Sequence, residues 1–141
     1  MVKAIQFHKA GGPSVIKWEE VKLGKPRKGQ ALVRHTAIGL NYIDTYQRSG
    51  MYPMPLPSGL GMEAAGVVEA VGAGVKHVKA GDRVAYGSGA PGAYSEARVM
   101  DAATLVKIPR GIPDEAAAAM MLKGMTVEYL VRRTYPVKKG Q

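Results

Sequence analysis

The fold class is indicated first by the run Gly66-Val67-Val68-Glu69-Ala70-Val71-Gly72, an apolar segment of strand length with glycine at both ends. Short runs that are rich in β-branched residues and lie between turn formers are typical of strands rather than helices. A second run of this kind is Asp82-Arg83-Val84-Ala85-Tyr86. The centre of the chain therefore predicts two strands.

The same pattern extends outward from this centre in both directions. Further strands are predicted at residues 2–8, 16–21 and 31–38 on the N-terminal side, and at 93–100 and 105–108 on the C-terminal side. Several short strands separated by glycine and proline, with few helices among them, predict a small barrel or sandwich.

Helical character begins after residue 109. Pro113 followed by Asp114 and Glu115 opens a helix, because proline suits the first turn and the helix dipole favours acidic residues there. Gly124 is expected to interrupt this helix, and Thr126 to cap a second one that stops before the Tyr-Pro pair at 135–136. The predicted class is mainly β with C-terminal helices (α+β).

Composition narrows the classes of function. The chain has 141 residues, 46% of them hydrophobic and 22% charged, as expected for one globular domain. It has no cysteine, which excludes disulfides, Cys-ligated zinc and thiol catalysis and fits a cytoplasmic location. No run approaches the roughly 20 apolar residues of a membrane span, so no membrane partner is expected.

The net charge of +9 raises the question of nucleic-acid binding. The basic residues are scattered in small groups and do not alternate with aromatic residues as in a single-strand binder. Solvated basic faces are the favoured interpretation, and a nucleic-acid partner is not expected.

Two glycine-rich runs match the spacing of a dinucleotide fingerprint. Residues 87–92 match the form with three glycines, and residues 59–64 match the looser form that ends in alanine. The fingerprint requires a strand before it and a helix after it, because the pyrophosphate binds at the helix N-terminus. The run at 59–64 follows a proline-rich segment, and the run at 87–92 precedes an alternating, strand-like segment. Neither is interpreted as a cofactor site.

Four stretches carry a resemblance to a known family: NYIDTYQRSGMY at 41–52, PSGLGMEAAGVV at 57–68, VKAGDRV at 78–84 and LKGMT at 122–126. Together they closely resemble the zeta-crystallin-like quinone oxidoreductases of the medium-chain dehydrogenase/reductase superfamily, over essentially the whole chain. The resemblance implies a GroES-like β-barrel over 1–110 and a helical connection over 111–141. That connection would lead to a Rossmann domain that is absent from the chain.

The resemblance also implies an activity. The full-length protein would be an NADPH-dependent quinone or enone reductase and a homodimer, whereas this chain alone is expected to be inactive. Zinc-dependent members of the superfamily have a Gly-His-Glu motif where this chain has Met62. The three histidines, His8, His35 and His77, lie on separate predicted segments, so no zinc and no metal ligands are expected.

The candidate site residues follow from the same resemblance. Asn41, Tyr46 and Tyr52 are the predicted catalytic residues. An amide can donate hydrogen bonds to a ligand oxygen, and a tyrosine hydroxyl can stabilise a developing enolate or hydroquinone anion. The predicted contacts with the cofactor, which supplies the redox chemistry, are Asn41, Tyr42, Ile43, Asp44, Thr45, Tyr46 and Thr126.

Several alternatives stay open on sequence alone. Asp44 either assists proton transfer or caps a short helical turn, and Glu63 is expected to be a structural hydrogen-bond partner in the cleft. Lys123 is expected to be solvated, with contact to phosphate or substrate as the alternative, and Met62 to line a pocket. A different class of function is a non-catalytic barrel that binds RNA or protein, although the cluster of Asn41 and tyrosines favours an enzyme.

Overall fold

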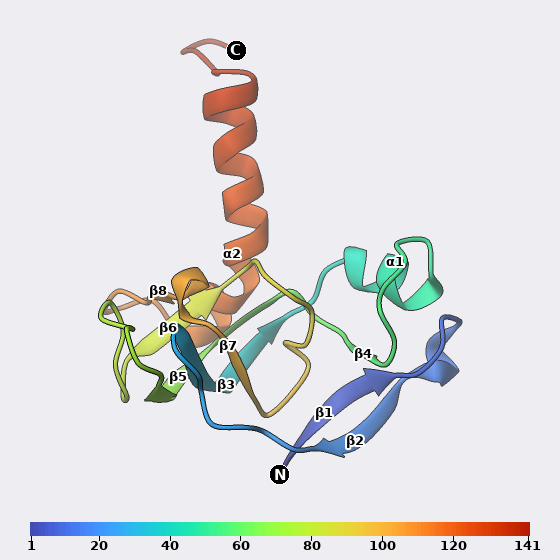
Figure 1. Cartoon of the computed structure of the whole chain (residues 1–141). Helices are drawn as coiled ribbons and strands as arrows, with labels where there is room; N and C mark the ends of the chain where they lie inside the picture. The colour runs from blue at the N-terminus through green and yellow to red at the C-terminus, as the bar shows by residue number, and fades with distance from the viewer.

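The computed structural model describes residues 1–141 and consists of two antiparallel sheets and a long C-terminal helix (Figure 1). The larger sheet has the strand order β7-β3-β5-β6-β8, and the smaller sheet has the order β2-β1-β4. The strands are β1 (Val2–Phe7), β2 (Lys17–Val21), β3 (Gln30–Gly39), β4 (Ser58–Gly59), β5 (Glu63–Val71), β6 (Arg83–Tyr86), β7 (Ala97–Asp101) and β8 (Val106–Lys107).

The helices are few, as the sequence predicts. They are α1 (Ile43–Ser49), α2 (Asp114–Tyr129), two 3₁₀ turns at Pro13–Val15 and Ala102–Thr104, and a π-helical turn at Leu130–Thr134 that continues α2. The predicted mainly β class with C-terminal helical structure is confirmed. No helix is both long enough and apolar enough to cross a membrane.

The apolar run that predicts the fold lies in β5, at the middle of the larger sheet. β5 pairs with β3 on one side and with β6 on the other. Val33 of β3, Val68 of β5 and Val84 of β6 are fully buried and share one core cluster with Tyr86. Burying each of these side chains contributes about 1.5–3 kcal/mol, so the central strands hold the main core of the protein.

Residues 94–96 join the two sheets. The amide of Ile5 in β1 donates to the carbonyl of Tyr94 at 2.7 Å, and the amide of Glu96 donates to that of Lys3 at 2.9 Å. The carbonyl of Glu96 also accepts from the amide of His35 in β3 at 2.9 Å. Because this segment divides its backbone bonds between β1 and β3, the strand predicted at 93–100 begins only at Ala97. No helix follows either glycine run, as expected.

The C-terminal helix differs from the sequence-based prediction. α2 runs without a break from Asp114 to Tyr129, so the expected interruption at Gly124 is wrong. Thr126 does not cap a second helix, and its hydroxyl donates to the carbonyl of Leu122 at 2.8 Å within the helix. Interior glycine costs a helix only about 1 kcal/mol relative to alanine, which good helix formers on either side offset. The predicted stop at the Tyr-Pro pair is confirmed.

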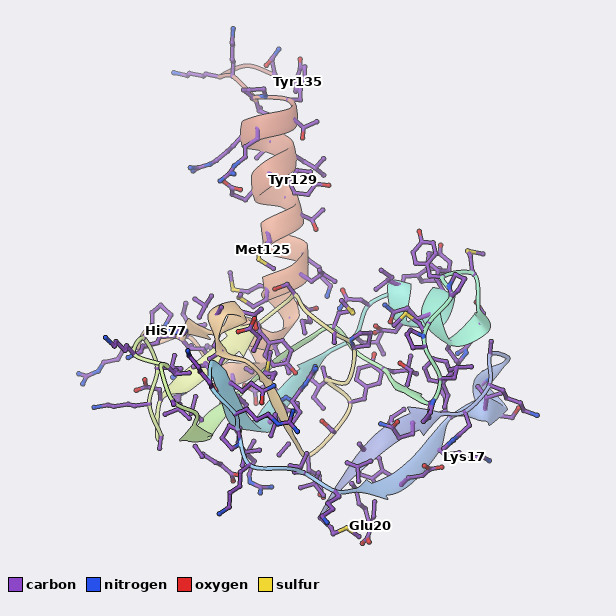
Figure 2. The ribbon with its side chains drawn as sticks, in the orientation of Figure 1. Lys17, Glu20, His77, Met125, Tyr129 and Tyr135 are labelled. Carbon is purple, nitrogen blue, oxygen red and sulfur yellow. The ribbon has the colours of Figure 1, made fainter.

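Helix α2 contacts the sheets from its first turn up to Lys123. Ala117 and Ala118 are buried against β5 and β6, whereas the part of the helix after Lys123 projects away from both sheets (Figure 1). Met125, Tyr129 and Tyr135 lie along the projecting part and are 42%, 48% and 62% exposed (Figure 2). Small alanine side chains allow the helix backbone to approach the sheet closely. This approach brings α2 near the end of β3 and the start of β5.

His35 connects the core to the junction between the sheets. Its Nδ1 lies 2.7 Å from the carbonyl oxygen of Ser95, and its Nε2 lies 2.8 Å from the hydroxyl of Tyr86. A carbonyl only accepts, so Nδ1 carries the proton and Nε2 accepts from Tyr86. Burial lowers the pKa of His35 to about 4, although the hydrogen bond to Ser95 opposes the shift. The neutral ring is therefore part of the folded structure.

We predict that acid destabilises the protein through His35. The pKa is near 6.5 in the unfolded chain and about 4 in the folded one, so the unfolded state binds the proton more tightly. The contribution is present above pH 6.5, is lost as the pH falls to 4, and amounts to about 2–3 kcal/mol. Urea unfolding between pH 7 and 4 measures it. His35→Gln should weaken the dependence of the free energy of unfolding on pH in this range, whereas the exposed control His8→Gln should not. An equal pH dependence in all three proteins would contradict the prediction.

Candidate functional site

The candidate site is built around the carboxylate of Glu63, at the first position of β5. The side chain is fully buried, and both of its oxygens accept hydrogen bonds. Oε1 accepts from Asn41 Nδ2 at 2.8 Å and from Lys123 Nζ at 2.6 Å. Oε2 accepts from the backbone amide of Leu122 at 2.7 Å. A buried carboxylate needs this degree of compensation, and the expectation that Glu63 is a structural hydrogen-bond partner is confirmed.

Lys123 is expected from the sequence to be solvated, and its side chain is 53% exposed, but its ammonium is bound within the polar network. Its ammonium lies 2.6 Å from Glu63 Oε1 and 2.9 Å from Asn41 Oδ1. It also donates to the carbonyl of Leu40 at 3.3 Å. The stem of the side chain stays half exposed while the charged end is bound, as long basic side chains commonly allow.

Asn41 and Asp44 form the second part of the polar network, where the chain passes from β3 into α1. Both are buried, at 8% and 5% exposure. Asp44 Oδ2 accepts from the backbone amide of Asn41 at 3.0 Å and from the hydroxyl of Tyr94 at 2.6 Å. Burial and the nearby Asp44 carboxylate raise the pKa of Tyr94, which keeps its phenol protonated as a donor. The observed bonds of Asp44 hold the start of α1 in place.

The three predicted tyrosines form an exposed aromatic cluster beside this network. The rings of Tyr42 and Tyr46 are 5.2 Å apart in an edge-to-face arrangement, and those of Tyr46 and Tyr52 are 5.4 Å apart. Tyr42 is 73% exposed and Tyr52 is 49% exposed, whereas Tyr46 between them is partly buried. Such pairs orient the rings and leave flat apolar surface for a ligand ring. We call Tyr42, Tyr46 and Tyr52 the tyrosine cluster.

The other predicted cofactor contacts are less closely grouped. Ile43 and Thr45 lie in the first turn of α1 and are partly buried, and the hydroxyl of Thr45 donates to the carbonyl of Tyr42 at 2.7 Å. Thr126 is exposed on α2, three residues after Lys123. The structure thus brings Asn41 together with Lys123 of α2, and leaves Thr126 about one turn further along the same helix.

Met62 and the histidines do not form a metal site. Met62 Sδ lies 3.6 Å from Gln47 Nε2 of α1, which places this thioether against the helix that carries Tyr46. No group of three or more histidine, aspartate or glutamate side chains is arranged to hold a metal ion. The Glu63 carboxylate is already paired with an ammonium, which is a poor neighbour for a divalent cation.

A separate apolar groove lies at the junction of the two sheets. It has a volume of about 400 Å³ and is lined by residues that include Ile5, Trp18 and Ile38. Tyr94 and His35 also line it, but no predicted site residue does. Tyr94 therefore connects this groove to Asp44 and the polar network. No local motif in the sequence points to Tyr94, because its partner Asp44 lies 50 residues away.

Comparisons with known proteins find relatives by sequence and by fold. The family described as the alcohol dehydrogenase GroES-like domain matches residues 27–110. The chain is 54% identical over its full length to the quinone oxidoreductase of Pseudomonas aeruginosa. It is 47% identical, over 99% of its length, to the 2-haloacrylate reductase of a Burkholderia species. The solved Escherichia coli quinone oxidoreductase complexed with NADPH superposes on 96% of the chain with a TM-score of 0.94 and 52% identity.

The coverage of these relatives is partial. The chain spans 44% of the Pseudomonas and Burkholderia proteins and 42% of the solved E. coli chain. The relatives therefore have more than half of their length outside the part that matches this chain.

Proposed function

Because the chain belongs to the alcohol dehydrogenase GroES-like domain family, we propose that it forms the substrate-side part of an NADPH-dependent reductase of quinones or enones. The match confirms the GroES-like fold and the oxidoreductase family that the sequence motifs indicate. The quinone is suggested by the names of the Pseudomonas and E. coli relatives, and an activated alkene by that of the Burkholderia relative.

The observation that carries this proposal is that the tyrosine cluster around α1 follows directly in the chain on Asn41, which belongs to the polar network at the start of β5. Tyr46 and Tyr52 offer ring surface and hydroxyl donors, and Asn41, which directly precedes Tyr42 in the chain, offers an amide. A quinone needs a flat apolar contact for its ring and donors for the charge that develops on its oxygens. We propose Asn41, Tyr46 and Tyr52 as the catalytic residues.

NADPH would supply the hydride when bound. We propose that Asn41, Tyr42, Ile43, Asp44, Thr45, Tyr46 and Thr126 form the part of its binding site that lies in this chain. The fit rests on unused donors and exposed surface. One N–H of the Asn41 amide has no acceptor in the chain, and the side chains of Tyr42 and Thr126 are exposed. Asp44 is buried and would act on the cofactor only by holding Asn41.

We also propose that the reaction is independent of zinc. The donor set does not fit the ion, because both Glu63 oxygens are engaged by N–H donors and one of those donors is the Lys123 ammonium. Cysteine is absent, and Met62 stands where zinc-dependent relatives have histidine. Catalytic zinc usually has three protein ligands drawn from His, Cys and carboxylates.

From the same resemblance we propose that the chain divides into a domain over 1–110 and a helical connection over 111–141. We propose further that the whole protein is a cytoplasmic homodimer and that this chain alone does not catalyse turnover. The exposed apolar side chains on the projecting half of α2 support a connection toward further structure. NADPH oxidation by the 141-residue chain itself would contradict the last of these.

The function is tested with a chimera in which this chain replaces the matching segment of the Pseudomonas relative. We expect NADPH oxidation with 2-methyl-1,4-naphthoquinone or with cyclohexenone. Tyr46→Phe should lower kcat/KM about tenfold or more, because a donor to the developing anion is lost, whereas the control Tyr135→Phe should have no such effect. A folded chimera without turnover on either acceptor, or steeply salt-dependent RNA binding by the chain, would favour the non-catalytic alternative.

A further inference from the structure

The ammonium of Lys123 is bound by oxygens of the protein, although its side chain is 53% exposed. It has three N–H donors, and three oxygens accept from it: the carbonyl of Leu40, Oδ1 of Asn41 and Oε1 of Glu63. These oxygens lie at the end of β3, before α1 and at the start of β5, so one side chain of α2 connects all three places. Neutralising Glu63 requires only one of these contacts.

The contacts of Lys123 select one orientation of the Asn41 amide. Oδ1 accepts from Lys123, Nδ2 donates to Glu63 Oε1, and the same Oε1 accepts from Lys123. These atoms form a closed ring, which only the N–H on the same side of the amide as Oδ1 is placed to complete. The other N–H of Nδ2 points away from the ring, and no acceptor in the chain takes it.

We propose that Lys123 is a positioning residue that, with Glu63, holds this second N–H of Asn41 as a donor for a ligand oxygen. The inference rests on the proposed function and adds the chemistry of the group that binds there. That group is a hydrogen-bond acceptor, a carbonyl or carboxamide oxygen, and not an N–H donor. The quinone and the nicotinamide of NADPH both carry such an oxygen, so the two ligands have to be tested separately.

The orientation is tested first on the 141-residue chain, by NMR of the Asn41 side-chain amide. In the unmodified chain the N–H on the Oδ1 side should exchange slowly with solvent and the other one quickly. In Lys123→Met the ring is open, and the difference between the two exchange rates should shrink at least severalfold. The control Lys107→Met removes an ammonium that pairs with Asp82 at 2.9 Å on another surface, and should leave the Asn41 signals unchanged. Unchanged exchange in Lys123→Met would overturn the proposal.

The consequence for binding is tested in the chimera. Loss of one oriented hydrogen bond should raise KM about three- to tenfold, for the quinone or for NADPH, whichever binds the amide, and kcat should fall as well if the amide donates to the quinone oxygen on which charge develops. Asn41→Ala should have the same effect, and the double variant should be no worse than Asn41→Ala alone. Lys123→Arg keeps a positive charge beside Glu63 without the ammonium geometry, so it should restore stability but not KM.

The outcomes separate positioning from a merely structural role. If Lys123 only neutralises Glu63, then Lys123→Arg restores KM together with the melting temperature, and the effects of Lys123→Met and Asn41→Ala on KM add; either result overturns the proposal. The NMR measurement needs no turnover, so an inactive chimera would count against the proposed function while the orientation of Asn41 is still decided.

Discussion

Replacing Glu63 with alanine is expected to lower the free energy of unfolding by about 3–5 kcal/mol, the largest effect of any substitution considered for this protein. The large cost arises because the substitution removes an acceptor that three donors share. The Leu122 amide, the Asn41 amide and the Lys123 ammonium all donate to this fully buried carboxylate. The Leu122 and Asn41 donors that lose this buried acceptor carry the full desolvation penalty of about 1–3 kcal/mol each, whereas the half-exposed Lys123 side chain can turn toward water.

The matched control for this substitution lies on the same strand. Glu69 of β5 forms an exposed ion pair with Arg34, and such surface pairs contribute about 0–1 kcal/mol. Urea unfolding followed by circular dichroism should therefore separate Glu63→Ala clearly from Glu69→Ala. Glu63→Gln should fall between them, because it keeps an acceptor but loses the charge that pairs with Lys123. Equal stability of the two alanine variants would show that the network carries little energy.

Replacing Gly39 with alanine is expected to cost about 3 kcal/mol or more. A Cβ at this last position of β3 would lie 2.4 Å from the backbone carbonyl oxygen of Ala118 and 2.4 Å from Cγ of Glu63. Neither neighbour is the free end of a flexible side chain, so helix α2 has to move away from the sheet. That movement would also lengthen the hydrogen bond from Leu122 to Glu63.

The control for Gly39→Ala is Gly24→Ala, because a Cβ at Gly24 would meet nothing within 4 Å. Its stability should change by less than about 0.5 kcal/mol. Thermal or urea unfolding measures the difference, and hydrogen exchange at the Leu122 amide reports whether the helix has shifted. Gly39→Ala with unchanged stability and unchanged protection at Leu122 would mean that α2 adapts without loss, contrary to the prediction.

Much of the fold is predictable because the strands depend on local pattern. The run in β5 and the alternation in β3 indicate strands without reference to any distant residue, and the structure has them at these places. The π-helical turn at 130–134 ends at the predicted Tyr-Pro pair for an equally local reason. The prediction at Gly124 is wrong because it treats one unfavourable residue as decisive, although α2 as a whole offsets that cost.

Local sequence patterns indicate only part of the candidate site. Its aromatic residues lie within one short segment, and the family resemblance identifies them without a structure. The role of Lys123 was missed, since a single lysine on a helix is usually solvated and no pattern points to a buried partner 60 residues away in Glu63. Tyr94 was missed for the same reason, because its partner Asp44 is 50 residues distant.

By itself, the sequence determined the β class, the exclusion of thiol chemistry and, through its motifs, the family. Only the tertiary structure decided which polar groups meet. Ala117 and Ala118 let α2 pack closely on the sheet, and Gly39 leaves room for that approach. This places the Lys123 ammonium on Glu63 and Asn41, contacts whose energy depends on burial, and burial is a property of the packed elements rather than of any residue alone.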